Sequence, residues 1–439
     1  MTPHGTSPHA TTRRPLRHRV AVAAAAVTAL LAGSTAPAVA TGSGDGLWYF
    51  TETGIAEAHQ RTRGEGITIA VIDGTINPDA PDLVGANVTV HEPSYCAATP
   101  GGPAVTARTT APDAVHGTTV TSMIAGTGLG TGGLTGTVGV APGAEVRFYS
   151  VASSVNGRDI ECSHSDVLMG DQMAAAIGQA VADGADIISI SIGEIESTEK
   201  DDAIAAAQRA GVILVVSVPN TSFEPDSPSN ANGVVAVERS DVDGSSATDT
   251  MEPTPWITVA APGQHVRLSS PTWDGYVLAS GSSYATPFTA GVLALVWSAY
   301  PGATANQMIQ SLIRNTGPTD HELARTAELG YGIVNVQQML AHDPTTYPDE
   351  NPLLRDDAEP STAAILGQPE PGADATTAPP ADAQDTTSPE ATSSVSPLLI
   401  AVAGALGVLV LTGIVIAVVL TRRARRTTAT SPPSPGPRV

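Results

Sequence analysis

The chain has 439 residues, of which 41% are apolar, so it is long enough to bury a large core and is not a small disulfide-stapled module. Its formal charge is −22. Nine of the 21 basic residues lie near the two termini, and the acidic centre that remains repels nucleic acid, which we exclude as a partner.

The first 40 residues have the pattern of a secretory signal peptide. A basic n-region runs from Arg13 to Arg19, an apolar h-region begins at Val20, and small residues occupy positions 38–40 (AVA), as at a cleavage site. We therefore expect residues 1–40 to be removed and the mature chain to start at Thr41. The alternative is an N-terminal membrane anchor, but the apolar run is shorter than the roughly 20 residues that a bilayer requires.

Residues 41–340 alternate short apolar runs with helix-like stretches. The runs are almost continuously apolar, which is typical of strands that are covered on both faces. Alternation of strands and helices indicates an α/β fold with a mostly parallel sheet and helices on both faces. The predicted strands are residues 66–73, 145–151, 185–192, 212–218 and 233–238.

Three polar residues stand where such a sheet places its working groups. Asp73 ends the first strand, and the carboxyl ends of parallel strands form the functional edge of an open sheet. His116 opens a helix, where Gly117 permits close backbone approach, and Ser283 opens another helix. Alone, each could be a turn residue, a structural histidine or a helix cap. Together they supply the nucleophile, the base and the buried carboxylate of a hydrolytic triad, in one of its known chain orders.

The segments around these residues resemble the subtilisin-like serine proteases (subtilase family, peptidase S8). The strand-end Asp73, the helix start His116-Gly117-Thr118 and the segment at 281–287 (GSSYATP) match the three signatures of that family. Two further segments also match, at 139–151 (GVAPGAEVRFYSV) and 330–340 (GYGIVNVQQML). The resemblance implies a three-layer subtilisin-like fold and a serine endopeptidase that acts on protein or peptide substrates.

The resemblance also assigns roles to residues outside the triad. It implies that Asn220 donates a hydrogen bond in the oxyanion hole, and that Ser191, Ile192 and Gly193 line the pocket for the substrate residue before the cleaved bond. Two positions depart from the family pattern. Asp73-Gly74-Thr75 exchanges the usual order of the last two residues, which displaces a local hydroxyl hydrogen bond, and Pro219 stands where glycine is usual.

The two cysteines, Cys96 and Cys162, lie in loop-like parts of a chain that we expect to be secreted. An oxidising compartment favours their pairing in one disulfide, and neither has the surroundings of a nucleophile. The ten histidines are scattered and no H-E-x-x-H motif occurs, so we predict no metal site and no cofactor.

The C-terminal part has the pattern of a membrane anchor. Residues 341–396 are rich in Pro, Asp and Thr and predict a disordered stalk. Residues 397–420 contain no charge and predict a transmembrane helix, since a buried core helix would not follow such a stalk. The arginine-rich tail, residues 421–439, then lies in the cytoplasm, because basic residues stay on that side. We thus expect a single-pass protein of the cell membrane with its catalytic domain outside.

This order of segments is similar to that of the mycosins, the membrane-anchored subtilases associated with type VII secretion in actinobacteria. Their segment before the catalytic aspartate is matched by Trp48, Gly54 and residues 62–66 (TRGEG). The resemblance implies contact with membrane components of that secretion system. Three functions stay open: an endopeptidase, which we favour, a catalytically weak scaffold subunit of a secretion complex, and a stalked binding module.

Overall fold

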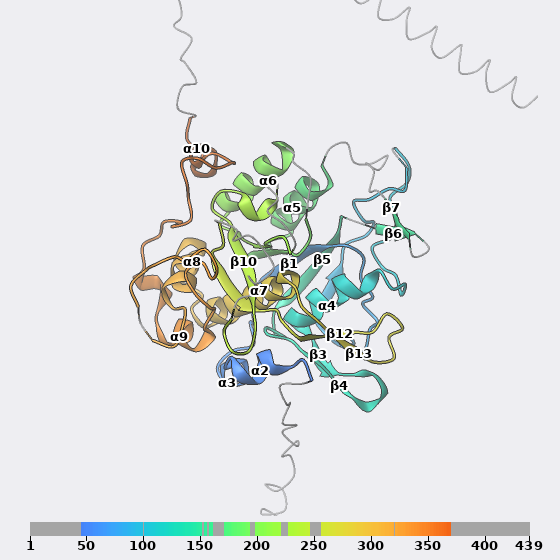
Figure 1. Cartoon of the computed structure of the whole chain (residues 1–439). Coiled ribbons are helices and arrows are strands. Elements are labelled where there is room, and N and C mark those ends of the chain that lie inside the picture. Colours follow the sequence, from blue (N-terminus) through green and yellow to red (C-terminus); the bar gives the residue numbers. More distant parts are fainter. Residues whose placement is uncertain are drawn as a thin grey trace, which may run out of the picture. The chain divides into compact units, whose positions relative to one another are not determined.

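In the computed structural model, seven parallel strands form one sheet in the order β11-β10-β9-β8-β1-β5-β2 (Figure 1). The structure describes residues 45–99, 101–151, 153–155, 158–160, 171–193, 198–220, 227–245, 256–319 and 321–369, and the sheet and all other elements below refer to these residues. The strands are β1 (Thr68–Asp73), β2 (Val88–Val90), β5 (Glu145–Ser150), β8 (Ile187–Ile190), β9 (Ile213–Ser217), β10 (Val235–Ser240) and β11 (Val259–Pro262).

Each of the five strands that we predicted forms in the sheet, and the parallel pairing is confirmed. β2 and β11, which join the two edges of the sheet, were not predicted. They have three and four residues, too short for an apolar run to stand out from the loops around them.

Helices cover both faces of the sheet, as the alternation of elements predicts. One face is covered by α4 (Ala114–Ala125) and α7 (Ser282–Ala299), whose side chains share a buried cluster with those of α8 (Ala305–Arg314) and α9 (Val336–Ala341). The other face is covered by α5 (Gln172–Ala182) and α6 (Thr198–Arg209). Two short helices near the start of the described chain, α2 (Trp48–Glu52) and α3 (Ile55–Ala58), join the first cluster.

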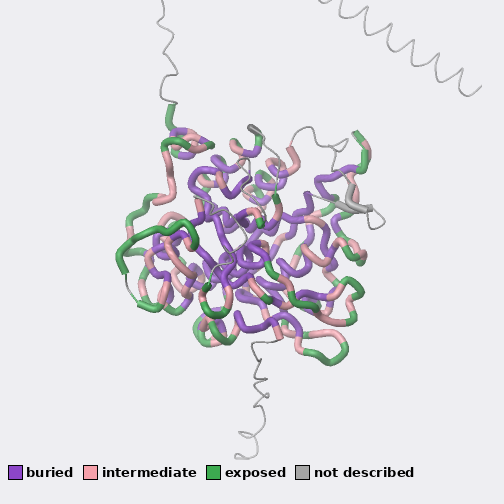
Figure 2. Tube along the Cα trace, viewed as in Figure 1, coloured by how far each residue is buried: buried purple, intermediate pink, exposed green. Residues whose placement is uncertain are grey.

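The strands supply both cores because successive side chains of a strand point to opposite faces. In β1, Ile69 and Val71 join the cluster of α4 and α7, whereas Ala70 and Ile72 join the cluster of α5 and α6. Both faces are therefore apolar, and Figure 2 shows the strands and inner helices as a continuous buried centre. Polar side chains that could act in catalysis therefore lie at the ends of the strands.

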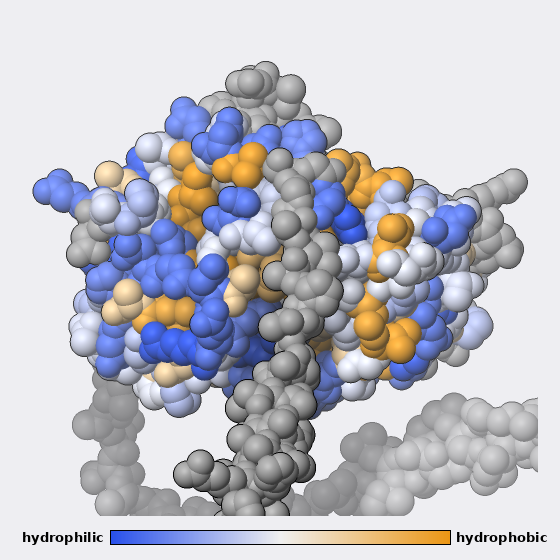
Figure 3. All heavy atoms as spheres, turned by 90° about the horizontal axis from the view of Figure 1, so that it is seen from below, coloured by the Kyte–Doolittle hydropathy of each residue, from blue (hydrophilic) through white to orange (hydrophobic). Residues whose placement is uncertain are grey.

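Short two-stranded hairpins lie outside the main sheet. They are β3 (Thr127–Leu129) with β4 (Thr135–Val138), β6 (Ser153–Val155) with β7 (Arg158–Ile160), and β12 (Val266–Ser269) with β13 (Tyr276–Ala279). Single turns of 3₁₀-helix lie at Thr131–Gly133, Pro228–Asn230 and Pro344–Thr346. Figure 3 shows the face that carries α2 and α3, where small apolar patches alternate with polar ones.

The ordered body continues past residue 341, where we predicted that the stalk would start. Residues 341–369 pack on the body and include a further helix, α10 (Thr362–Leu366). The buried Asn232 side chain exchanges hydrogen bonds with the backbone of Arg355 (2.9 and 2.7 Å), and its N–H donates to the carbonyl of Glu359 (2.7 Å). The composition of this segment is polar, but its backbone satisfies a buried amide, a tertiary contact that composition does not reveal.

The remaining part of the predicted stalk, the predicted signal peptide, the transmembrane helix at 397–420 and the tail lie outside the described residues. Within the described ranges, no helix combines the length and the apolar character that crossing a membrane demands. The prediction of a membrane anchor therefore stays a prediction.

Candidate active site

Asp73 is the last residue of β1 and lies at the carboxyl edge of the sheet, as predicted. Its side chain is 1% exposed, and Oδ1 accepts hydrogen bonds from the N–H of Gly74 (2.7 Å) and from Nδ1 of His116 (2.8 Å). Oδ2 is buried and has no hydrogen-bond partner among the residues that the structure describes. The hydroxyl of Thr75 donates to Asp113 Oδ2 instead (3.1 Å), so the exchanged Gly74-Thr75 order directs the hydroxyl away from Asp73, as we expected.

His116 lies in the first turn of α4, and its position depends on the glycine that follows it. A Cβ on Gly117 would stand 2.3 Å from the carbonyl oxygen of Thr75 and 2.9 Å from Cζ of Phe148. Only glycine therefore lets α4 approach the loop after β1 closely enough for the imidazole to reach Asp73. This contact confirms the expected role of Gly117.

The charge of Asp73 sets the protonation of His116. Burial by itself would lower the pKa of the imidazole, but the adjacent carboxylate and its hydrogen bond outweigh burial, and the pKa is raised above its ordinary value. The hydrogen bond occupies Nδ1 and so leaves Nε2 as the nitrogen that can exchange a proton with a reactant. The His116 side chain keeps 36% of its exposure, so a substrate can reach it.

Ser283 lies in the first turn of α7, next to a residue whose ring faces the same imidazole. The rings of His116 and Tyr284, the residue after Ser283, have centroids 6.1 Å apart. In this arrangement Ser283 Oγ donates to the carbonyl of Ser191 (3.1 Å), and Ser191 Oγ donates to the carbonyl of Ser283 (2.9 Å). The structure thus brings Asp73, His116 and Ser283 to one edge of the sheet, while the hydroxyl of Ser283 is hydrogen-bonded to the strand end rather than to His116.

Asn220 follows β9, and its side-chain amide is oriented through its oxygen. Oδ1 accepts from the N–H of Ser282 (3.0 Å), from the hydroxyl of Ser282 (3.2 Å) and from Nη1 of Arg239 (2.6 Å). Because the oxygen is held by these donors, the NH₂ group is directed to the opposite side and is available to a further acceptor. Pro219 does not prevent this geometry, and the Ser282 hydroxyl also donates to the carbonyl of Val218 (2.5 Å).

The segment predicted to bind substrate follows β8. Ser191 is buried, Ile192 is half-buried and Gly193 is exposed, and the reciprocal hydrogen bonds of Ser191 tie the start of this segment to Ser283. No contact given by the structure tests their role in a substrate pocket.

Cys96 is buried and disulfide-bonded, whereas its predicted partner Cys162 lies outside the described residues. In the described ranges, no group of three or more His, Cys, Asp or Glu side chains is placed to hold a metal ion.

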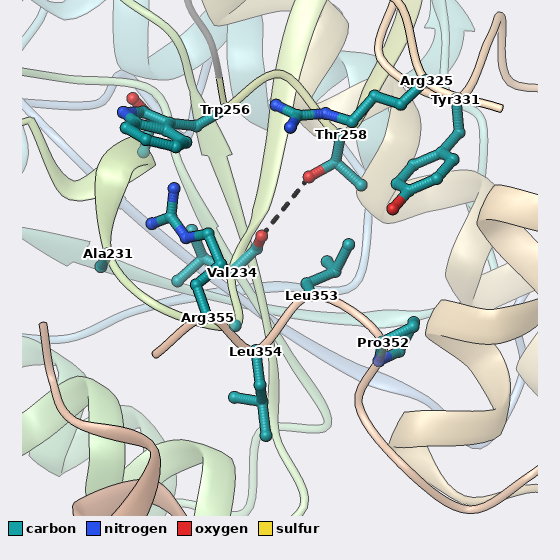
Figure 4. Close-up of a pocket in the computed structure, with 12 residues that line it drawn as sticks. Ala231, Val234, Trp256, Thr258, Arg325, Tyr331, Pro352, Leu353, Leu354 and Arg355 are labelled. Atoms are coloured by element: carbon teal, nitrogen blue, oxygen red, sulfur yellow. Dashed lines mark hydrogen bonds between the residues drawn. The ribbon is translucent and has the colours of Figure 1, made fainter. Parts of the chain in front are cut away.

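A cavity of about 260 Å³ lies between the β9–β10 connection and the C-terminal segment (Figure 4). Arg325 and Arg355 both reach it, and the Arg355 guanidinium stacks on the ring of Trp256 at 4.1 Å. None of the residues that we predicted to be functional lines this cavity. It is therefore distinct from the edge that carries Asp73 and His116.

Sequence reasoning did not single out one residue that touches the site. Arg239 lies in β10, is 8% exposed and reaches Asn220 through its guanidinium. The available signal was the charged pair Glu238-Arg239 at the end of an apolar run (VVAVERS), because charged residues are almost never buried unless they are paired.

The sequence of this chain is similar to those of known subtilases. The model of the subtilase family (Peptidase S8) matches residues 64–332. The chain is 33% identical to the thermostable alkaline protease of Halalkalibacterium halodurans over 60% of this chain and 66% of that protein. It is 29% identical to mycosin-3 of Mycobacterium tuberculosis over 66% of this chain and 70% of that protein.

Solved structures show the same fold. A structure described as MycP1 from the ESX-1 type VII secretion system superposes with a TM-score of 0.53 at 21% identity, covering 72% of this chain and 91% of that one. The family match includes Asp73, His116, Asn220 and Ser283 and extends over more than half of the chain. The chain therefore belongs to the subtilase family of serine endopeptidases.

Proposed function

We propose that this protein cleaves peptide bonds with Ser283 as nucleophile, His116 as base and Asp73 as the carboxylate that orients the base. The observation that carries the proposal is the 2.8 Å hydrogen bond from His116 Nδ1 to the buried Asp73, at the sheet edge to which α7 brings Ser283. That bond fixes the tautomer in which Nε2 can accept a proton. Ser283 Oγ leaves the Ser191 carbonyl, gives its proton to Nε2 and attacks the substrate carbonyl, and His116 then protonates the leaving amine.

The negative oxygen that forms on the substrate requires donors that are already in place. We assign this role to the side-chain NH₂ of Asn220 and the backbone N–H of Ser283. The latter lies in the first turn of α7, where N–H groups have no partner within the helix and the helix dipole favours negative charge. Since Asn220 Oδ1 is held by three donors, its NH₂ needs little rearrangement when the oxyanion forms.

The finer part of the proposal concerns the location and the partners of the enzyme. We propose that cleavage after residue 40 releases the signal peptide, that residues 397–420 anchor the protein in the cell membrane, and that the catalytic domain lies outside. Support comes from the uncharged 24-residue segment with arginines directly after it, and from the likeness to mycosins, one of which is described as part of a type VII secretion system. Protein substrates would then be met at the outer face of the membrane.

A fluorophosphonate probe tests the catalytic proposal, because it phosphonylates an activated serine. The full-length chain should be labelled, and the Ser283→Ala and His116→Ala variants should not. Ser298→Ala is a matched control, since Ser298 lies on the same helix but donates to the carbonyl of Glu65, and it should be labelled like the unmodified chain. Equal labelling of the Ser283→Ala variant, or none of the folded unmodified chain, would refute the assignment.

A scaffold role in a secretion complex is the second candidate, and two observations favour it. Asp73 Oδ2 has no hydrogen-bond partner in the described part of the chain, and the Ser283 hydroxyl donates to Ser191 rather than to His116. Both features would weaken the cooperation of Asp73, His116 and Ser283 in catalysis. If a Ser283→Ala variant supports protein secretion from the cell as well as the unmodified chain does, the scaffold role holds and proteolysis is not its essential contribution.

A further inference from the structure

Arg239 places a buried positive charge behind the amide of Asn220. It lies in β10, the strand directly beside β9, and Asn220 follows β9. Its Nη1 donates to Asn220 Oδ1 at 2.6 Å, the shortest of the three hydrogen bonds to that oxygen. Asn220 itself is exposed, so the packing around it does not hold its amide in one orientation.

The position of Arg239 is costly for stability. Its side chain is only 10% exposed, and its stem lies beside the start of α7, since a Cβ on Gly263 would meet both Arg239 Cβ (2.8 Å) and the carbonyl of Gly281 (2.7 Å). Burial of a charge is unfavourable, and a cation near the positive end of a helix dipole is unfavourable as well. A buried arginine therefore needs partners for its charge, and Asn220 is one of them.

Glu238 compensates this charge in part. Its Oε1 accepts the backbone N–H of Arg239 (2.7 Å) and lies 3.7 Å from the guanidinium, beyond hydrogen-bond distance. Among the described residues, the guanidinium donates a hydrogen bond to Asn220, whereas the neighbouring carboxylate lies beyond hydrogen-bond distance. The positive charge is directed toward the amide that we assign to the oxyanion hole.

We propose that Arg239 is a positioning residue that fixes and polarises Asn220 for stabilisation of the oxyanion. The proposal rests on the function assigned to Asn220 above. The guanidinium adds the shortest hydrogen bond to those from Ser282 on Oδ1, which restricts rotation of the amide and keeps the NH₂ group toward the substrate. It also draws electron density toward Oδ1, which makes the NH₂ group a stronger donor to a negative oxygen.

The test compares fluorophosphonate labelling of full-length variants at saturating probe, which separates the maximal labelling rate from probe affinity. Removal of one oxyanion donor lowers rates by about 10² to 10³. We expect Asn220→Ala to show a loss of this size. Arg239→Met keeps the apolar stem and should lower the maximal rate by about tenfold to hundredfold with nearly unchanged affinity, whereas Arg239→Lys should recover part of the loss.

The double variant distinguishes positioning from general packing. In the Asn220→Ala background, Arg239→Met should cause no further loss, because there is no amide left to orient. An equal loss in both backgrounds, or a full rate for Arg239→Met, would overturn the proposal. If Asn220→Ala alone is labelled at the full rate, the assigned role of Asn220 fails and this inference fails with it.

A stability control covers the case in which Arg239→Met leaves Glu238 buried without its partner. The variant Glu238→Gln with Arg239→Met removes both charges and should unfold near the temperature of the unmodified chain. It should still lose the same fraction of its maximal labelling rate. Full labelling by this well-folded variant would overturn the proposal.

Discussion

The close approach of α4 to the loop after β1 yields a quantitative prediction for Gly117→Ala. The added Cβ would stand 2.3 Å from the Thr75 carbonyl oxygen, whereas real Cβ contacts are essentially never under 3.0 Å, so the helix and the loop must separate by at least 0.7 Å. Asp73 and His116 lie on these two segments. Their 2.8 Å hydrogen bond would lengthen to about 3.5 Å, beyond the usual limit.

The expected result is a loss of both activity and stability. A misplacement of about 1 Å in a catalytic group can reduce a rate by about 10², so we expect the maximal fluorophosphonate labelling rate to fall by roughly tenfold to hundredfold. Overpacking costs about 1–3 kcal/mol, and the better helix propensity of alanine returns about 1 kcal/mol. The free energy of unfolding should therefore fall by up to about 2 kcal/mol, as measured by denaturant titration.

Gly178→Ala is the matched control, because Gly178 is an exposed glycine inside α5 and an added Cβ would have nothing within 4 Å. Helix propensity then acts alone, and the variant should gain about 0.5–1 kcal/mol at full activity. If Gly117→Ala were as stable and as active as Gly178→Ala, the claim that Gly117 sets the distance between Asp73 and His116 would be refuted.

Three further predictions follow from the same site and from the disulfide. The labelling rate should fall as the pH is lowered through the pKa of His116, with a midpoint above the ordinary value of about 6.5, because the effect of the Asp73 carboxylate outweighs that of burial. The stability that this pair contributes is complete below that ordinary value and is lost as the pH rises through the raised pKa. Activity and this part of the stability should therefore change in opposite directions. A midpoint below about 6 would contradict this reasoning. Gly74→Ser has room for its side chain and adds a hydroxyl on the residue after Asp73, whose Oδ2 has no partner among the described residues. If that hydroxyl donates to Oδ2, the variant should be more stable by about 1 kcal/mol in denaturant titration, and a less stable variant would argue against a missing donor. Cys96→Ser should lower the free energy of unfolding by about 2–4 kcal/mol, and thiol alkylation with and without reductant should show whether Cys162 is the partner.

The sequence was sufficient for the sheet because its strands are apolar on both faces. A run such as residues 212–218 has no polar side to expose, so it can only be a strand covered by helices. The candidate site was equally accessible, since a polar residue that directly follows such a run lies at the functional edge of the sheet. The local motif around Ser283 then indicated the candidate nucleophile.

The sequence was less informative where a contact joins distant segments. Residues 341–369 look like the start of a disordered stalk by composition, yet they pack on the body through Asn232 and Arg355. Arg239 is separated from Asn220 by 19 positions, and no local motif marks their contact. Both contacts depend on how segments far apart in the sequence pack together.

The sequence by itself indicated the family, the main strands of a parallel sheet and the identity of the candidate catalytic groups, because each of these is encoded in a local pattern of apolar runs and short motifs. The order of the strands in the sheet came from the structure. Only the tertiary structure decided that Asp73 holds His116 with one oxygen and leaves the other unpaired, that Ser283 rests on Ser191, and that a buried arginine holds Asn220. Hydrogen bonds depend on the distance and direction between atoms, and for residues far apart in the chain these are fixed only when the sheet and its helices pack together.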